Sequence, residues 1–321
     1  MNSALRPLVA TALIFVFAYG AAALQFPGLL SSRVLGDLLT DNAFLGITAV
    51  GMTFVILSGG IDLSVGAVIG FTGVLVAVLI SSGGLHPLVA FAMALTVAAA
   101  FGAAMGCIIH YLEVPSFIVT LAGLFLARGA ASIITQDSIP IDHLFYHQVS
   151  ELYLKLPGGG RITAIGGLMV LVFAIGTLLA HRTRFGSNVY AIGGNATSAS
   201  LMGVPIARTT ILIYTLSSFL AALGGIVFSL YTSAGYPLAA VGVELDVICA
   251  VVIGGTLLAG GYGFVVGTFI GVMLQGLVQI YIIFDGTLSS WWTKIVIGFL
   301  LFVFILMQRL LFSAPVRGRA E

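Results

Sequence analysis

Long apolar runs recur along almost the whole chain, and short stretches that carry glycines, prolines and charges separate them. A helix needs about 20 residues to cross the hydrocarbon core of a bilayer, so a window of about 19 residues finds such helices. The runs lie near residues 8–24, 42–58, 64–80, 87–109, 114–134, 163–180, 208–230, 244–260, 264–283 and 294–312. The pattern predicts an all-α polytopic membrane protein of about ten transmembrane helices, with residues 1–321 as a single transmembrane domain.

Two of the polar stretches are too long to be simple turns. Residues 135–162 contain Pro140, Pro157 and a run of three glycines, and they form the longest loop on one side of the predicted helices. We expect this loop to be a landing surface for an external partner. Residues 181–207 form the longest loop on the opposite side.

The loop 181–207 carries helix signals of its own. Asn195 or Thr197 can cap the start of a short helix, and Gly203 can end it in a left-handed turn. Pro205 prevents its continuation because proline lacks the amide hydrogen. We therefore expect a short helix near residues 197–202.

Composition agrees with a membrane domain and excludes several other classes of protein. Hydrophobic residues make up 60% of the 321 residues and charged residues only 7%, against roughly 25% charged residues in soluble domains. The net charge of +1 provides no basic face, so a nucleic-acid partner is not expected.

The distribution of Lys and Arg predicts the orientation, because these residues favour cytoplasmic loops. The side of the predicted helices that the two termini share carries Arg6, Arg182, Arg184, Arg208, Arg309, Arg317 and Arg319. The other side carries Arg33, Lys155 and Arg161, with Lys294 near the mouth of the last run. Both termini are therefore expected to be cytoplasmic.

Two segments of the chain align with each other without gaps. Residues 50–70 match residues 251–271, including the glycine pairs Gly59-Gly60 and Gly260-Gly261. Internal repeats are common in transporters, although glycine and valine matches also arise by chance in apolar sequences. The alignment indicates an internal repeat that the sequence alone does not establish.

The first copy of this segment contains the most informative polar residues. Gly59 and Gly60 interrupt an apolar run, and Asp62 and Ser64 follow directly. A carboxylate at membrane depth costs about 2.5–3.5 kcal/mol unless it is paired or wetted. One interpretation is a tight turn in which Asp62 and Ser64 cap the next helix, and the other is a hinge on a transport pathway. A capped turn can also serve as a hinge.

Arg128 is a second costly residue inside an apolar run. A structural ion pair or the capping of backbone carbonyls explains it as well as a role in a pathway does.

The residue patterns of enzymes and metal proteins are missing from the sequence. A phosphate-binding loop needs lysine after glycine, and neither Lys155 nor Lys294 follows one. His143 and His147 lack a third ligand nearby, and Cys107 and Cys249 lie in apolar runs as small hydrophobes. We therefore expect no catalytic residue, metal site or cofactor, and the energy for transport must come from another protein.

Three stretches of the sequence together resemble a known family. They run from Asp41-Asn42-Ala43-Phe44 through Gly51-Met52-Thr53 to Gly59-Gly60-Ile61-Asp62-Leu63-Ser64-Val65-Gly66, then over residues 115–121 (PSFIVTL), and then over residues 189–199 (VYAIGGNATSA). In this order they resemble the ribose-type permease family of bacterial sugar ABC importers, over nearly the whole chain. Residues 40–46 and 284–294 are most similar to the permeases of galactofuranose importers.

This resemblance implies partners and site residues. The chain would act in the bacterial inner membrane together with three other proteins. These are a cytoplasmic ABC ATPase with two nucleotide-binding cassettes, a periplasmic sugar-binding protein and a second, similar permease subunit that forms a heterodimer with this chain. The loop 181–207 resembles the segment that couples to the ATPase, which makes candidates of Gly193, Gly194, Asn195, Ala196, Thr197, Leu201 and Gly203. Candidates for a hinge or pathway are Gly59, Gly60, Asp62, Ser64, Phe117, Thr120 and Arg128. Many relatives carry an acidic residue after the loop asparagine, whereas this chain has Ala196 there.

Other functions remain open at this level. Importers of another sugar such as ribose, or of branched-chain amino acids or nucleosides, would share the same fold. A secondary transporter driven by ions or protons is a rival from another class, although it would be expected to carry more paired carboxylates inside the membrane.

Overall fold

The computed structural model describes residues 6–289 and 291–312, and these residues are mainly helical. Ser290, Arg317 and Arg319, which entered the expectations above, lie outside the described residues. The helices are α1 (Arg6–Gln25), η2 (Pro27–Leu30, a 3-10 helix), α2 (Ser32–Asp41), α3 (Ala43–Leu57), α4 (Val65–Ser81), α5 (Pro87–Tyr111), α6 (Ser116–Ile134), α7 (Leu144–Glu151), α8 (Ala164–Arg182), α9 (Arg184–Leu201), α10 (Ile206–Thr232), α11 (Val243–Ile253), α12 (Val265–Asp285) and α13 (Trp291–Phe312).

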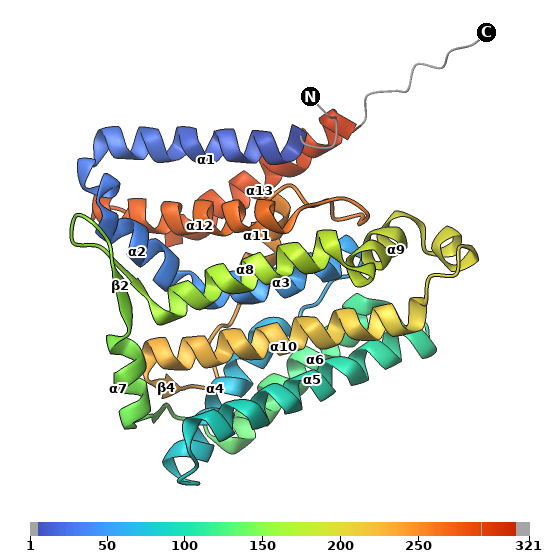
Figure 1. The fold of residues 1–321 in the computed structure, drawn as a ribbon, viewed down its shortest axis with the longest axis horizontal. Coiled ribbons are helices and arrows are strands. Elements are labelled where there is room, and N and C mark those ends of the chain that lie inside the picture. Colours follow the sequence, from blue (N-terminus) through green and yellow to red (C-terminus); the bar gives the residue numbers. More distant parts are fainter. Residues whose placement is uncertain (1–5, 290, 313–321) are drawn as a thin grey trace.

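The long helices lie side by side, and α9 projects from one end of the bundle while α7 and the strands cover the other end (Figure 1). α10 is the central packing element, in contact with α3, α4 and α5. α3 is buried along almost its whole length, including the large side chains Phe54, Ile47 and Met52. A helix that is apolar all round needs such surroundings, so α3 forms the core of the domain.

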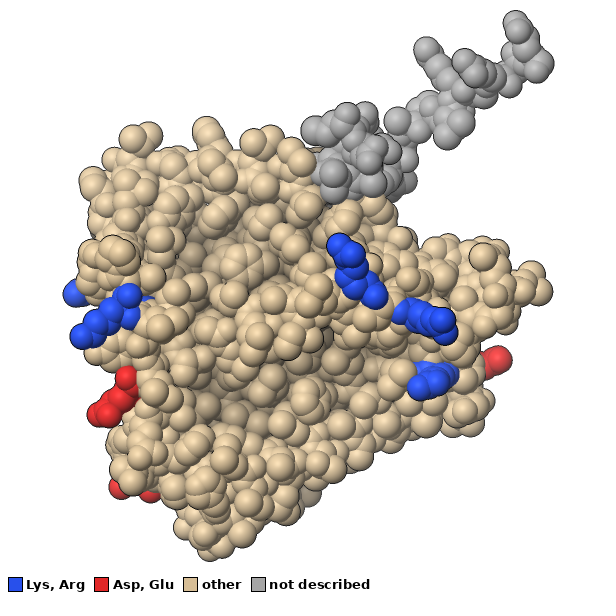
Figure 2. All heavy atoms as spheres, in the orientation of Figure 1, with Lys and Arg blue, Asp and Glu red and all other residues tan. Residues whose placement is uncertain are grey.

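Charged side chains gather near the two ends of the molecule, and a broad uncharged band separates them (Figure 2). Within the described residues, six helices are long and apolar enough to cross a membrane, and α2 with α3 forms a further candidate that is bent by 56°. α4 and α13 are shorter apolar helices. The uncharged band and these helices agree with the prediction of a polytopic membrane protein.

One predicted span is shorter than expected. The apolar run 244–260 forms only the 11 residues of α11 before the chain turns. At about 1.5 Å per residue this helix is about 16 Å long, half of the ~30 Å hydrocarbon core. Gly254 and Gly255 end the helix, and Gly255 has a φ of +92°, which explains why hydropathy alone overestimated its length.

The two aligned segments of the repeat fold alike. α3 and α4 are joined by a glycine turn, and α11 and α12 are joined by another. Gly59 and its counterpart Gly260 both have a φ of +84°. The structure therefore has two similar units of helix, glycine turn and helix at the positions that the alignment indicated.

The loop 135–162 is an ordered cap rather than a simple linker. Strand β1 (Ile139–Pro140) pairs with β4 (Ala234–Gly235), and β2 (Tyr153–Lys155) pairs with β3 (Arg161–Thr163), in both cases antiparallel. Helix α7 lies between β1 and β2 in the chain. These strands are the exception to the predicted all-α fold, and they hold the loop over the end of the bundle (Figure 1).

Glycines let α11 and α12 pack backbone against backbone. A Cβ atom on Gly271 would collide with the carbonyl oxygen of Ala250, and one on Gly267 would collide with the carbonyl oxygen of Gly254. Small residues allow membrane helices this close approach. The pair α11 and α12 is thus held by direct backbone contact.

We predict that Gly271→Ala lowers the midpoint of thermal unfolding, because the new methyl group must separate α11 from α12 at a cost of about 1–3 kcal/mol. The control is Gly129→Ala in α6, where a Cβ atom has no neighbour within 4 Å. Alanine favours helix over glycine by about 1 kcal/mol, so the control should keep or raise the midpoint. Unfolding of the purified protein in detergent measures both, and equal midpoints would contradict the prediction.

Candidate functional site

The turn between α3 and α4 is built around Asp62. The Asp62 carboxylate is fully buried, and its Oδ1 accepts hydrogen bonds from the Ser64 amide at 2.9 Å and the Ser64 hydroxyl at 2.6 Å. Its Oδ2 accepts a 2.7 Å bond from the hydroxyl of Ser217 in α10. Asp62 therefore holds the turn together and binds it to the central helix. Its role as a hinge on a pathway stays a prediction.

Helix α6 holds the same turn through the backbone of Ile61. The Ser116 hydroxyl accepts a bond from the Ile61 amide at 3.3 Å, and the Thr120 hydroxyl lies 3.3 Å from the Ile61 carbonyl oxygen. Broken backbone inside a membrane protein needs such internal partners. Thr120 thus contacts the turn, whereas Phe117 is 50% exposed on the surface of α6. A part of either residue in a pathway stays a prediction.

The second glycine turn, residues 254–264, packs directly against the first. The Gly261 amide donates a 2.8 Å bond to the carbonyl oxygen of Leu57, the last residue of α3. A Cβ atom on Gly260 would lie 2.7 Å from the Gly59 nitrogen. The two turns of the repeat are therefore in backbone contact.

Helix α9 contains the short helix that was predicted in the loop 181–207. Asn195 breaks the helical path with a φ of −165°, and its Oδ1 accepts a 2.8 Å bond from the Ser198 amide. Asn195 is thus the N-cap of the second part of α9, which includes Ala196 and Thr197. Gly203 has a φ of +80° after the helix end, as expected for a left-handed C-terminal residue.

The first part of α9 was not predicted as a helix. Thr183 caps its start by accepting a bond from the Gly186 amide. Local propensity does not predict this helix, because glycine, serine and asparagine favour turns over helices when they are considered alone. All three occur in its first turns, in the sequence Arg184-Phe185-Gly186-Ser187-Asn188.

The end of this first part contacts the end of α3 and the second glycine turn. A Cβ atom on Gly193 would collide with the Leu57 carbonyl oxygen and with the Gly261 nitrogen. A Cβ atom on Gly261 would in turn lie 2.8 Å from the Gly194 Cα atom. We call this meeting of Gly59-Gly60, Gly193-Gly194 and Gly260-Gly261 the glycine junction.

A hydrogen bond beside the glycine junction fixes α9 in place. The Tyr190 hydroxyl donates a 2.7 Å bond to the carbonyl oxygen of Gly263 in the second turn. Burial raises the pKa of Tyr190 to about 12, so the hydroxyl keeps its proton at physiological pH and the bond persists. α9 and the second turn are therefore connected by side-chain as well as backbone contacts.

The second part of α9 presents apolar side chains to the outside of the protein. Leu201 is 87% exposed and Met202 is 84% exposed. Leu201 is the last residue of α9 and Met202 follows it, and α9 projects from the bundle (Figure 1). Exposed apolar side chains on a helix that leaves the membrane band are typical of a protein contact.

Arg128 lies apart from the glycine junction. One of its guanidinium nitrogens, Nη1, donates bonds to the carbonyl oxygens of Pro237 at 2.6 Å and Ala239 at 2.7 Å. These carbonyls belong to the segment between β4 and α11. These contacts agree with the capping of backbone carbonyls, which is one of the roles that the sequence left open for Arg128.

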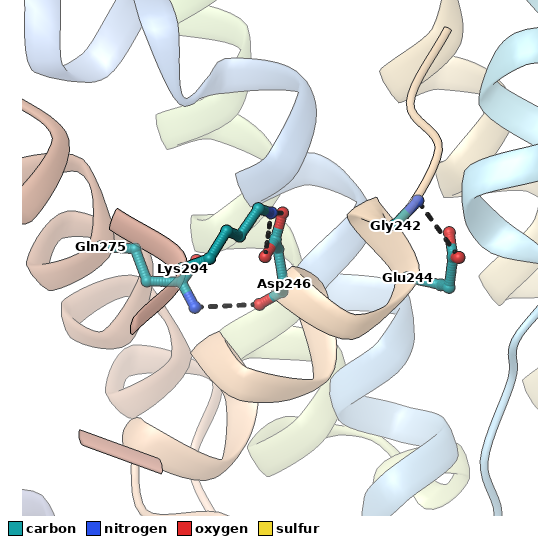
Figure 3. A network of polar contacts seen from close by, with 5 residues as sticks. All are labelled: Gly242, Glu244, Asp246, Gln275 and Lys294. Carbon is teal, nitrogen blue, oxygen red and sulfur yellow. Dashed lines mark hydrogen bonds and ion pairs between the residues drawn. The ribbon is translucent and has the colours of Figure 1, made fainter. Parts of the chain in front are cut away.

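A pocket of about 560 Å³ with a partly polar lining lies beside α11, between α2, α10, α12 and α13. Lys294 of α13 donates a 2.7 Å bond to Oδ1 of Asp246, and Gln275 of α12 donates a 3.0 Å bond to the Asp246 carbonyl oxygen (Figure 3). The Tyr231 hydroxyl donates a 3.1 Å bond to Asp41 at the same pocket. The pocket offers carboxylate, amide and hydroxyl groups to a polar solute.

Three residues of the glycine junction and its supports were not singled out from the sequence: Ser116, Tyr190 and Ser217. Ser217 belongs to a Ser-Ser pair inside the apolar helix α10, and that pair was a usable signal. For Tyr190 no local signal exists, because its partner Gly263 is 73 residues away. Within the described residues, no three His, Cys, Asp or Glu side chains are close enough to hold a metal ion.

Comparison with known proteins identifies the family. Residues 34–305 match the model of the family described as branched-chain amino acid transport system / permease component. The inner membrane ABC transporter permease protein YjfF of Escherichia coli K12 is 62% identical over 94% of this chain and 92% of its own length. No solved structure matches the chain.

Two further relatives are named as sugar permeases. The fructose import permease protein FruG of Bifidobacterium longum is 36% identical over 94% of this chain and 90% of its own length. The ribose import permease protein RbsC of Escherichia coli K12 is 38% identical over 78% of each chain. This chain therefore belongs to the family of sugar ABC transporter permeases, multi-pass inner-membrane translocation subunits that are not enzymes and that act with a separate ATPase and a substrate-binding protein.

Proposed function

We propose that this chain is the permease subunit of a galactofuranose importer, and that the glycine junction transmits the motion of the ATPase to the transport pathway. The observation that carries the coupling role is the direct contact of Gly193 with Leu57, the last residue of α3, and with Gly261 in the second glycine turn. Each turn joins two apolar helices of the membrane domain. A displacement of α9 must therefore displace α3, α4, α11 and α12.

In this mechanism the second part of α9 docks on the ATPase. Leu201 and Met202 provide the exposed apolar contact, and Asn195 and Gly203 define the two ends of the docking helix. Ala196 and Thr197 form its first turn. The binding protein delivers the sugar to the opposite end, where the loop 135–162 forms the ordered cap.

The orientation follows from the same mechanism. α9 must face the cytoplasm to meet an ATPase, and the Lys and Arg bias of the sequence supports that placement of both termini. The chain then forms a single transmembrane permease domain over residues 1–321, with 181–207 as the cytoplasmic coupling loop.

A neutral sugar is the cargo that the polar groups support best. The pocket near Asp246 offers hydroxyl and amide groups from Gln275, Gln279 and Thr293, and Lys294 neutralises Asp246. The fructose and ribose permeases among the relatives support a sugar over a branched-chain amino acid or nucleoside. The resemblance of residues 40–46 and 284–294 to galactofuranose permeases supports that sugar and a heterodimer with a second permease.

Uptake of radiolabelled sugar by cells that lack only this chain tests the proposal. Loss of galactofuranose uptake, restored by the chain, is the expected result, with ribose, fructose and leucine as comparison substrates. Restored uptake of one of these instead would assign that substrate. Uptake by the chain alone in vesicles under an ion gradient would identify a secondary transporter and overturn the importer.

Gly193→Ala should reduce sugar uptake and substrate-stimulated ATP hydrolysis at least about tenfold, because its methyl group collides with the backbone at the end of α3 and in the second turn. Gly194→Ala is the matched control, since a Cβ atom there has no neighbour within 4 Å. Both rates are measured on the complex in proteoliposomes after equal insertion has been verified. Equal activity of the two variants would refute the role of the glycine junction.

The variant Asp62→Asn should retain most of the sugar uptake, and the variant Asp62→Leu should abolish it. An amide of the same shape can still accept a bond from Ser64 and can donate one to Ser217. Leucine leaves these partners unsatisfied at about 1–3 kcal/mol each. Uptake and thermal unfolding are compared for both variants, and equal uptake would show that Asp62 contributes only packing.

A further inference from the structure

Three arginines surround a hollow of about 880 Å³ at the end of the bundle from which α9 projects. Arg182 ends α8, Arg184 begins α9, and Arg208 lies in the first turn of α10. All three are exposed. The ion pairs among the described residues are Asp142 with His147 and Asp246 with Lys294, so no carboxylate there neutralises these arginines.

The other groups at this hollow also suit an anion. Thr183, Ser187, Asn188 and Thr209 line it with polar side chains. The N-termini of α9 and α10 both lie at its edge, and helix N-termini carry a partial positive charge that favours anions. The hydroxyls of Thr183, Ser187 and Thr209 already donate to backbone carbonyl oxygens. The hollow therefore combines three full positive charges with the Asn188 side chain and two helix N-termini.

An apolar groove of about 290 Å³ lies next to this hollow along the bundle. It runs between α8 and α10 over α3, and its lining includes Ile175, Leu179, Leu216 and Phe219. Phe185 in the hollow packs on Phe54 in the groove, with ring centroids 5.7 Å apart. The charged hollow and the apolar groove are therefore adjacent along the same pair of helices.

The length of this combined surface matches one leaflet of a bilayer. From Leu212 in the hollow to Leu223 at the far end of the groove, α10 rises about 16 Å at ~1.5 Å per residue. This is about half of the ~30 Å hydrocarbon core. Basic pockets between membrane helices are suited to the headgroups of anionic lipids.

We propose that the hollow and the groove bind one anionic phospholipid, with its phosphate among Arg182, Arg184 and Arg208 and an acyl chain between α8 and α10. A free phosphate ion would leave the groove empty. A zwitterionic lipid would leave the arginines without a net negative partner. An anionic phospholipid uses both parts of the surface.

The position of this lipid connects it to transport. Arg184 is the first residue of α9, the same helix that ends at Gly193 in the glycine junction. A lipid phosphate on Arg184 anchors the start of α9 to the membrane surface while the second part of α9 moves. Activity of the complex is then expected to depend on the anionic lipid content of the membrane.

The test is the number of phosphatidylglycerol molecules retained by the purified full-length protein with its partner subunits, counted by native mass spectrometry. The complex is first incubated with equal amounts of phosphatidylglycerol and phosphatidylcholine. Arg182→Gln, Arg184→Gln and Arg208→Gln should each weaken retention about fivefold, since one basic residue at an anionic surface contributes ~1 kcal/mol. Arg33→Gln, exposed at the opposite end, is the charge-matched control and should bind normally.

A second variant tests the groove without changing charge. Leu216→Trp fills the space between α8 and α10 and should also reduce retention, whereas the arginines remain in place. This variant keeps the test decisive if an arginine variant fails to fold.

Four results would overturn the proposal. The first is equal retention of phosphatidylcholine, and the second is unchanged retention of phosphatidylglycerol by the arginine variants. The third is displacement of the lipid by millimolar inorganic phosphate together with normal lipid binding by Leu216→Trp. The fourth is loss of the ATPase subunit from the arginine variants while their lipid binding is unchanged. The last result would assign the arginines to a protein contact. The count of bound lipid does not depend on transport, so failure here is distinguishable from failure of the importer assignment.

Discussion

The backbone contact at the glycine junction is the constraint on which the rest of this structure depends. Gly193 lies against the end of α3 and against Gly261, with no room for a Cβ atom. Packed protein interiors transmit displacement because they have few voids. Three segments that are far apart in the chain therefore form one mechanical unit, and two of them are the turns of the repeated helix pairs.

The same region also provides hydrogen-bond partners for the backbone where membrane helices are interrupted. Both turns leave backbone groups without helical partners, and these groups need internal hydrogen bonds in the absence of water. Asp62, Ser116 and Thr120 supply them in the first turn. The Leu57 carbonyl oxygen at the end of α3 accepts a hydrogen bond from the Gly261 amide of the second turn. The polar residues of the turns thus have a structural role, because they stabilise the turns in contact with α9.

Charge has different consequences at the two ends of the molecule. At the end with the cap, Lys294 and Asp246 neutralise each other beside a partly polar pocket that is open to a solute. At the end with α9, Arg182, Arg184 and Arg208 have no carboxylate partner among the described residues and face an adjoining apolar groove. One end is therefore suited to an uncharged polar cargo and the other to an anion with a hydrocarbon chain.

The sequence by itself determined the class of the protein, most of its membrane helices and the short helix after Asn195. These features depend on hydrophobic length and on local capping, and both are properties of neighbouring residues. It also located the glycine pairs and Asp62, since glycines and a carboxylate are conspicuous in an apolar run. Only the tertiary structure decided that α11 is half a span, that Arg128 binds the carbonyls of Pro237 and Ala239, and that Tyr190 holds Gly263. It also brought the three glycine pairs together, because contacts between residues far apart in the chain depend on how the helices pack rather than on local sequence.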